Sequence, residues 1–130
     1  MTKFDHSFGP PAPIAKIKLK RLDSSEVLGN VRMLLDTGSD ITLLPISSLD
    51  SLGVQPIGER TIALFGFDGQ ISESEIFRLQ ILFLGKRFTG NYCSINDSVG
   101  IIGRDILNQI ALVYDGPNLE WNEYRAALPI

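Results

Sequence analysis

The sequence predicts one predominantly β-stranded (all-β) domain with one or two short helices. Apolar and polar residues alternate in several short segments, which is typical of strands that bury one face. Residues that favour turns separate these segments, and few stretches have helical spacing. The chain has 130 residues, which is the length of a single domain.

The composition excludes several classes of function. The net charge is −3, so we expect no nucleic-acid partner. The single cysteine, Cys93, and the single histidine, His6, exclude an internal disulfide and the common zinc sites. We expect no metal and no cofactor, so any catalysis would depend on carboxylates, lysine, tyrosine or hydroxyl groups.

No segment has the sequence features of a membrane span or a signal peptide. Apolar runs such as Ile81–Leu84 are short, far below the roughly 20 residues that cross a bilayer. The first residues carry charges and then prolines, in place of an apolar stretch. We therefore expect a cytoplasmic protein with no membrane partner, and a lone thiol agrees with a reducing compartment.

Residues 1–13 are expected to form a Pro-rich arm ahead of a single domain at 14–130. A glycine and three prolines in the arm disfavour both a helix and a central strand, and His6 within it should be solvated. Residues 15–20 alternate apolar side chains with three lysines. This alternation predicts a strand whose lysines form a solvated face and discourage wrong pairing.

The other elements are expected from the same signals. They are a strand at 26–35 with a bulge or turn at Gly29–Asn30, a short strand at 41–44, a helix at 47–52, a hairpin of 60–67 and 70–84, a strand at 87–95, a helix at 104–110, and strands at 111–114 and 119–124. Ser47 and Gly53 should cap the first helix. Asp68-Gly69 between two strand-like runs is a strong hairpin signal, and Cys93 is expected in the core.

An aspartate ends an apolar strand in the segment 34–39, Leu-Leu-Asp-Thr-Gly-Ser. Burial at the end of such a strand makes ionisation of the Asp36 carboxyl costly. Gly38 lets a ligand come close, and the Thr37 and Ser39 hydroxyls can donate hydrogen bonds that hold the carboxylate. The pattern indicates a positioned acid or base, and the alternative is an ordinary Asx-type turn between strands.

A second motif favours the first of these interpretations. Residues 101–107 read Ile-Ile-Gly-Arg-Asp-Ile-Leu, which places two apolar residues and a glycine ahead of a helix. With the Asp-Thr-Gly sequence and the glycine-bearing hairpin between the two motifs, the chain resembles the retropepsins, the single-lobe aspartic peptidases of retroviral type. It most resembles the stand-alone retropepsin-like proteins of bacterial genomes, and the resemblance covers about residues 14–114.

The resemblance implies a closed β-barrel with a flap hairpin, assembled as a homodimer. It identifies Asp36 as the catalytic residue. It also implies that the Thr37 hydroxyl links the two active-site loops and that the Gly38 carbonyl contacts the substrate backbone. Ser39 matches a supporting position that is serine or alanine in the family.

The same resemblance assigns roles to charged residues beside the site. Asp40 would contact the substrate main chain and pair with Arg104, which stands in the Gly103-Arg104-Asp105 sequence. We expect this ion pair to be chiefly structural, with a secondary role in shaping the site. Asp105 is expected to cap the following helix rather than to react.

Residues 64–70, Leu-Phe-Gly-Phe-Asp-Gly-Gln, match the flap, the hairpin that covers the site. Substrate contacts are therefore assigned to Phe65, Gly66, Phe67, Asp68 and Gly69. Two alternatives stay open: the glycines serve a tight turn without function, and the phenylalanines belong to the core. The need for a lid that excludes water favours the flap.

Peptide hydrolysis of this type needs two carboxyl groups on either side of one water. The chain has one Asp-Thr-Gly sequence, so a second Asp36 must come from another copy across a two-fold axis. Two carboxylates at that distance share one proton. We expect a homodimeric aspartic endopeptidase that cuts extended polypeptides, prefers apolar residues around the cleaved bond and works best at acidic pH.

Three other functions are compatible with the sequence. The protein could be a non-catalytic peptide-binding or dimerisation module. It could be a highly selective processing protease, with Phe8-Gly9-Pro10 as a conceivable cleavage site, or a structural domain of a larger assembly.

The chain departs from the family in three ways. The flap lacks consecutive glycines, which bears on its mobility. The N-terminal arm is longer than in viral enzymes, and residues 115–130 extend past the strand that ends a viral protease. In the family the chain termini build much of the dimer interface. Residues 119–124 could therefore supply a strand to the dimer or cover the edge of the monomer.

Overall fold

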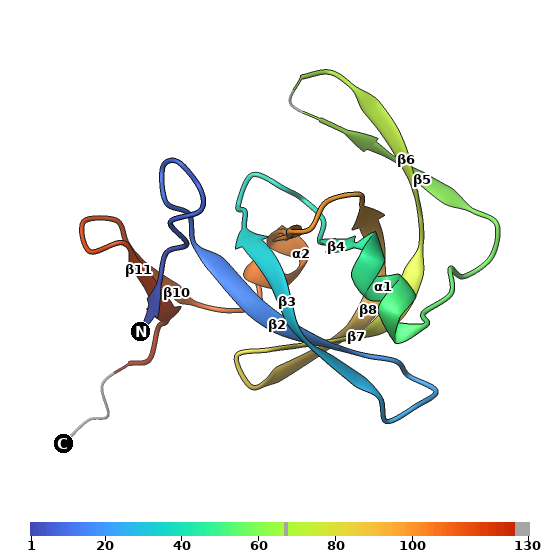
Figure 1. The fold of residues 1–130 in the computed structure, drawn as a ribbon, viewed down its shortest axis with the longest axis horizontal. Coiled ribbons are helices and arrows are strands. Elements are labelled where there is room, and N and C mark those ends of the chain that lie inside the picture. Colours follow the sequence, from blue (N-terminus) through green and yellow to red (C-terminus); the bar gives the residue numbers. More distant parts are fainter. Residues whose placement is uncertain (67, 127–130) are drawn as a thin grey trace.

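Six strands close into a barrel in the order β2-β3-β9-β4-β8-β7 (Figure 1). The structure is a computed structural model that describes residues 1–66 and 68–126. The barrel strands are β2 (Ile14–Lys20), β3 (Val27–Leu35), β4 (Leu43–Pro45), β7 (Phe77–Phe83), β8 (Lys86–Ile95) and β9 (Gly100–Ile102). The predicted all-β, closed-barrel fold is confirmed.

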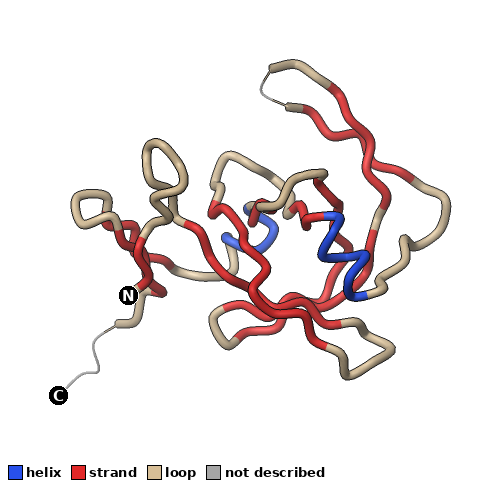
Figure 2. The backbone as a smooth tube through the Cα atoms, viewed as in Figure 1, coloured by secondary structure: helices blue, strands red, loops and turns tan. Residues whose placement is uncertain are grey.

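The remaining elements complete the fold (Figure 2). They are a three-stranded sheet of β1 (Thr2–Lys3), β11 (Glu120–Glu123) and β10 (Leu112–Asp115), a hairpin of β5 (Thr61–Phe65) and β6 (Ile71–Glu75), and the helices α1 (Ile46–Leu52) and α2 (Arg104–Leu107). In the part of the chain that is described, no helix has the length and apolar character needed to span a membrane.

Alternation of side chains along the strands produces the core of the barrel. On β2, Ile17 and Leu19 are buried, whereas Lys16 and Lys18 between and beside them are exposed. β7 repeats this alternation, with four buried residues at every second position. Burying an aliphatic side chain fully contributes roughly 1.5–3 kcal/mol. The alternation that predicts the strands therefore also drives the closure of the barrel.

A parallel pair of strands, β3 and β9, determines where the two sequence motifs lie. Their register places Met33 beside Gly100 and Leu35 beside Ile102, and β4 pairs with the other edge of β9. A Cβ at Gly100 would lie 2.5 Å from the Leu43 carbonyl oxygen, so this packing requires glycine. The ends of β3 and β9 consequently lie side by side.

Several local predictions are confirmed. The pairing of β2 with β3 shifts register near Asn30, which has a φ of 58°, so the expected bulge is present. Gly53 ends α1 in the left-handed conformation, with a φ of 75°. Cys93 is buried, and burial raises the pKa of its thiol.

Three predicted boundaries or caps are wrong. Helix α1 begins at Ile46 after Pro45, and within the described chain no side chain caps it, so Ser47 is not the N-cap. The second helix ends at Leu107 instead of residue 110. The segment 70–84 forms two strands, because the chain leaves the β5–β6 hairpin and then enters the barrel as β7.

The first residues pack against the C-terminal strands instead of forming a free arm. β1 pairs with β11, and Phe4 is 4% exposed, with its ring centroid 5.1 Å from that of Tyr114. Hydrogen bonds from Ser7, together with one from Arg32, lower the pKa of Asp5 to about 2. These contacts join the segment after β1 to the barrel strand β3.

β11 covers the edge of its own chain. It lies between β1 and β10, so both of its edges are paired within the chain. Trp121 in β11 is 4% exposed, its ring centroid lies 6.1 Å from that of Phe83, and its indole N–H donates to the Ile14 carbonyl at 3.4 Å. Of the two roles considered for residues 119–124, the structure shows the second.

Trp121→Ala should lower the free energy of unfolding by about 3–5 kcal/mol, because it empties a buried site where the terminal sheet meets the barrel. Tyr124→Ala is the control, since Tyr124 is 56% exposed and surface substitutions change stability by about 0.5 kcal/mol or less. Urea unfolding followed by circular dichroism measures both variants. Equal destabilisation would contradict the role given to Trp121.

Candidate active site

β3 leads directly into the loop that carries the candidate catalytic residue. Asp36 follows the last residue of β3, and its N–H donates to the Ile102 carbonyl at 3.0 Å. The Arg104 N–H donates to the Ser39 carbonyl at 2.9 Å. The structure therefore brings the two sequence motifs together through backbone hydrogen bonds.

The backbone of the loop orients the Asp36 side chain. The Gly38 N–H donates to Asp36 Oδ1 at 2.9 Å, whereas the Ser39 hydroxyl donates to the Ile41 carbonyl at 2.7 Å, and Thr37 is exposed. The expectation that the Thr37 and Ser39 hydroxyls hold the carboxylate is therefore wrong. The Asx-type turn, considered as the alternative, is present, and it positions the carboxylate.

Asp36 is half-buried and lines a pocket of about 720 Å³ between this loop, the β5–β6 hairpin and one end of the barrel. Gly38, Ser39 and Asp40 line the same pocket. A pocket of this size admits several side chains of an extended peptide. The loop therefore presents a carboxylate to a space that a polypeptide can enter.

Arg104 connects α2 to the Asp36 loop in a way that differs from the expected ion pair. Its Nη1 donates to the Thr37 carbonyl at 2.7 Å. Among the ion pairs of the described residues, none joins Arg104 to Asp40. The predicted pairing within one chain is therefore not formed, because the guanidinium is directed at the loop backbone. Asp40 remains exposed at the pocket.

Asp105 binds a buried threonine and does not cap α2. Its carboxylate accepts hydrogen bonds from the Thr42 N–H at 3.0 Å and from the Thr42 hydroxyl at 2.6 Å. The Thr42 hydroxyl also accepts the Gly103 N–H at 3.1 Å. Within the described chain no side chain caps α2, so the predicted capping role of Asp105 is wrong.

Gly103 allows the two loops to come this close. A Cβ at this position would lie 2.4 Å from the Ile41 carbonyl oxygen, a distance that no side chain can occupy. Gly103 is buried, and Thr42 is completely inaccessible to solvent. The loop that carries Asp36 therefore packs on a hydrogen-bonded base that is buried at Gly103 and Thr42.

The β5–β6 hairpin extends beyond the barrel (Figure 1). Phe65 and Gly66 line the pocket. Phe65 is 77% exposed, which excludes the alternative that it belongs to the core. Asp68 Oδ1 accepts the Gln70 N–H at 3.0 Å, and Gly69 has a φ of 80°, so these two residues form the turn. Phe67 lies outside the described residues.

Sequence reasoning missed two groups of site residues. The first is the apolar side of the pocket, formed by Leu43, Ile46, Ile95 and Ile101. The second is Thr42, and its signal is a polar residue inside the apolar run 41–44. Within residues 1–66 and 68–126, no three His, Cys, Asp or Glu side chains are grouped so as to hold a metal ion.

A barrel with an Asp-Thr-Gly loop, an Ile-Gly-Arg-Asp segment beneath it and a hairpin over the pocket defines a retropepsin-like aspartic peptidase fold. A family model described as aspartyl protease matches residues 24–106. This match covers more than half of the sequence, and the chain belongs to the aspartyl protease family.

Solved structures agree with this assignment. The EIAV protease complexed with the inhibitor HBY-793 matches with a TM-score of 0.54 and 22% identity, over 75% of this chain and 86% of that chain. At this identity the likeness shows a common fold. No curated protein matches the sequence, and the closer resemblance to stand-alone bacterial members stays a prediction.

Thr42→Val should lower the free energy of unfolding by about 1–3 kcal/mol, because the Gly103 N–H loses its buried acceptor and Asp105 loses a donor. Thr89→Val is the control, since Thr89 is exposed and accepts a hydrogen bond from Gln80 at the surface. Urea unfolding of both variants provides the comparison. A Thr42→Val variant as stable as Thr89→Val would show that the buried network is dispensable.

Proposed function

We propose that the protein is a homodimeric aspartic endopeptidase in which Asp36 is the catalytic residue. The observation that carries this proposal is the position of Asp36, half-buried on a pocket of about 720 Å³ and oriented by the Gly38 N–H at 2.9 Å. Membership of the aspartyl protease family supports it. The complete Asp-Thr-Gly sequence argues against a module that only binds peptides.

The mechanism follows from one carboxylate on each chain. In the dimer, Asp36 and Asp36 of the partner subunit face each other and share one proton, since two adjacent carboxylates do not both ionise easily. The ionised carboxylate removes a proton from the water that attacks the scissile carbonyl. The protonated carboxyl donates its proton to the carbonyl oxygen. Thr37, which is exposed at the end of the loop, is proposed to connect the two loops.

The substrate is an extended polypeptide that lies between the hairpin and the apolar side of the pocket. Leu43, Ile46 and Ile101 offer apolar surface to a substrate side chain, which favours apolar residues near the cleaved bond. The Gly38 carbonyl and Asp40, which line the pocket, are proposed to contact the substrate main chain. The hairpin residues Phe65 and Gly66 are proposed to cover the peptide and exclude water.

The free edge of β10 is the proposed dimer contact. Among the described strands, β10 pairs with β11 alone. The Tyr124 N–H donates to the Ala111 carbonyl at 2.8 Å across this pair. Backbone groups of successive strand residues point to opposite edges, so Leu112 and Tyr114 direct theirs away from β11. These groups are available to the same strand of a second copy.

The sequence of β10 suits such pairing. Natural edge strands are usually protected by lysine, proline or a bulge, whereas β10 reads Leu-Val-Tyr-Asp. Val113 and Tyr114 are 41% and 68% exposed. Antiparallel pairing of β10 with its copy has two-fold symmetry, which is the symmetry that two Asp36 residues require.

Asp36→Asn should abolish peptide cleavage, with a fall in kcat of at least about 10²–10⁴-fold, because the general base is lost. The measurement is digestion of a diverse peptide pool from about pH 3 to about pH 8, a range around carboxyl pKa values. Wild-type activity should rise toward acidic pH, where the pair holds one proton. The side chains that flank each cut also report the specificity.

The control for this experiment is Asp97→Asn, which removes an exposed carboxylate of the same kind outside the pocket. It should leave cleavage unchanged. Cleavage by Asp36→Asn would assign catalysis to another residue or to a contaminant. A wild-type dimer that cleaves nothing across the pH range would favour the peptide-binding module or a protease specific for one protein.

Tyr114→Pro should dissociate the dimer, because proline removes the N–H that points to the free edge of β10 while leaving the bonds to β11. Tyr114→Thr is the control, since it also removes the aromatic ring but keeps that N–H. Sedimentation velocity gives the oligomeric state, and cleavage at matched concentration gives the activity. Dissociation by both variants would assign the effect to the ring, and a Tyr114→Pro dimer would place the interface elsewhere.

A further inference from the structure

The outward face of four adjacent barrel strands is strongly basic. It is formed by the exposed-side positions of β3, β2, β7 and β8, and we call it the basic face. Its cationic residues are Lys16, Lys18, Lys20, Arg32, Arg78 and Arg87.

The strand register shows that these residues share one face. Lys16 lies beside Arg32 on β3, and a row across three strands runs from Lys18 through Leu82 to Arg87. Neighbouring residues on the same strands, such as Leu19 and Ile81, are fully buried in the barrel. Because strand side chains alternate between the two faces, the cations all point away from the core.

This face concentrates charge that the composition conceals. The chain has 12 Lys and Arg against 15 Asp and Glu. Half of its cations lie on this face, and β2, β3, β7 and β8 contain no Asp or Glu. The net charge of −3 is therefore the sum of a basic barrel face and an acidic remainder.

Three acidic residues near the basic face form ion pairs, two of them with cations outside the face and one with Arg32 of the face itself. Asp23 pairs with Arg21, Glu123 pairs with Lys86, and Asp5 pairs with Arg32. Among the ion pairs of the described residues, none involves the other five cations of the face.

Contacts of these five cations are few. Among the described residues, Lys16, Lys18 and Arg87 donate no hydrogen bond. Lys20 donates to backbone carbonyls, and Arg78 donates to the amide oxygen of Asn91. The carboxylates of an acidic partner could therefore form ion pairs with these five cations.

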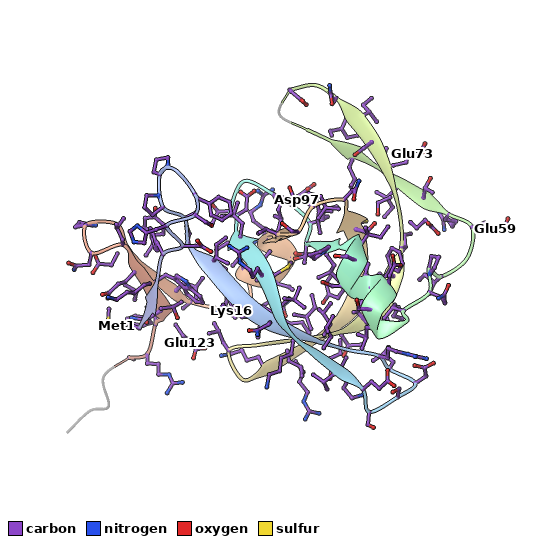
Figure 3. The ribbon with its side chains drawn as sticks, viewed as in Figure 1. Met1, Lys16, Glu59, Glu73, Asp97 and Glu123 are labelled. Atoms are coloured by element: carbon purple, nitrogen blue, oxygen red, sulfur yellow. The ribbon has the colours of Figure 1, made fainter. Side chains whose placement is uncertain are left out.

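The basic face lies apart from the candidate active site. None of its six cations lines the pocket of Asp36. Figure 3 shows Lys16 on the barrel and Glu73 on the hairpin, far apart in the view. A ligand on this face would therefore leave the pocket open, and this inference does not rest on the proposed function.

We propose that the basic face binds an extended, acidic segment of a polypeptide. Alternate residues of a strand are about 6.6 Å apart, which is also the spacing of alternate side chains in an extended peptide. Lys16, Lys18 and Lys20 therefore match a peptide with an acidic residue at every second position. Gln80, Thr89 and Asn91 lie on the same face and add polar groups on the strands beside β2.

The side chains on this face favour a polypeptide over other anions. Single-stranded nucleic acids are held by aromatic rings on which the bases stack, and no aromatic residue is exposed on these four strands among the described residues. Stable binding to a membrane surface combines attraction of cations to anionic lipids with burial of exposed apolar side chains. On these strands, as far as they are described, Val27 is the one large apolar residue that is exposed; it pairs with Lys20 at the first position of β3, and a single apolar side chain gives little membrane affinity.

Fluorescence anisotropy with a labelled peptide of alternating glutamate and serine tests this proposal. The wild-type protein should bind it at low ionic strength and release it as salt rises above about 0.1 M, where surface charges are screened. A peptide of alternating glutamine and serine should not bind. The double variant Lys18→Gln/Arg87→Gln should weaken binding about fivefold, because two surface ion pairs are lost.

The matched control is Arg60→Gln/Arg125→Gln, which removes the same charge from exposed residues elsewhere. It should change the affinity less than about twofold. Circular dichroism checks that both variants are folded, and Lys18→Gln alone replaces the double variant if that one unfolds. Equal loss in the two double variants would show a non-specific charge effect and overturn the proposal.

The same assay with oligothymidine and with phosphatidylserine vesicles identifies the class of ligand. Weaker binding of both than of the acidic peptide supports the proposal. Tighter binding of either one, lost in Lys18→Gln/Arg87→Gln, would assign the face to nucleic acid or to a membrane. Failure of the acidic peptide to bind at low salt would also overturn it. None of these outcomes depends on whether Asp36 cleaves peptides.

Discussion

The close approach of Gly103 to the backbone at Ile41 is the constraint on which the site depends. A Cβ there would lie 2.4 Å from the Ile41 carbonyl oxygen, so any other residue would push the two loops apart. With glycine present, the Gly103 N–H reaches the Thr42 hydroxyl, which in turn donates to Asp105. This chain of hydrogen bonds, buried at Gly103 and Thr42 and ending at the exposed Asp105, holds the end of β9 against the Asp36 loop.

The Asp36 loop is held by hydrogen bonds on the side of α2 and borders the pocket on its other side. The Arg104 N–H and guanidinium each bind a carbonyl of the loop, so carbonyls that would otherwise point into solvent have fixed partners. The Asp36 carboxylate receives a backbone N–H and faces the pocket. A hydrogen-bonded loop that presents a half-buried carboxylate to a pocket suits the proposed catalysis, because reorganisation during the reaction is then small.

Three surface features of the protein are the terminal sheet, the β5–β6 hairpin and the basic face of the barrel. The terminal sheet completes itself within one chain, since β11 fills the place between β1 and β10, and this leaves one backbone edge on β10. The hairpin of β5 and β6 keeps Phe65 exposed beside the pocket. Side chains alternate along β2, β7 and β8, so that apolar residues point into the core and cations point to solvent. The two-residue alternation of side chains along these strands therefore produces both the core and the basic face.

The sequence by itself determined most of the strands along the chain, the hairpin and the identity of the Asp36 loop, because alternation, turn residues and the Asp-Thr-Gly sequence are local signals. It also determined that Gly103 and Arg104 belong to the site. Only the tertiary structure decided the partners. Arg104 binds the Thr37 carbonyl instead of Asp40, Asp105 binds Thr42 instead of capping α2, and the first residues pack on β11. Hydrogen-bond partners that are distant in sequence depend on the strand register and on which backbone segments pack against each other. Local sequence patterns determine neither.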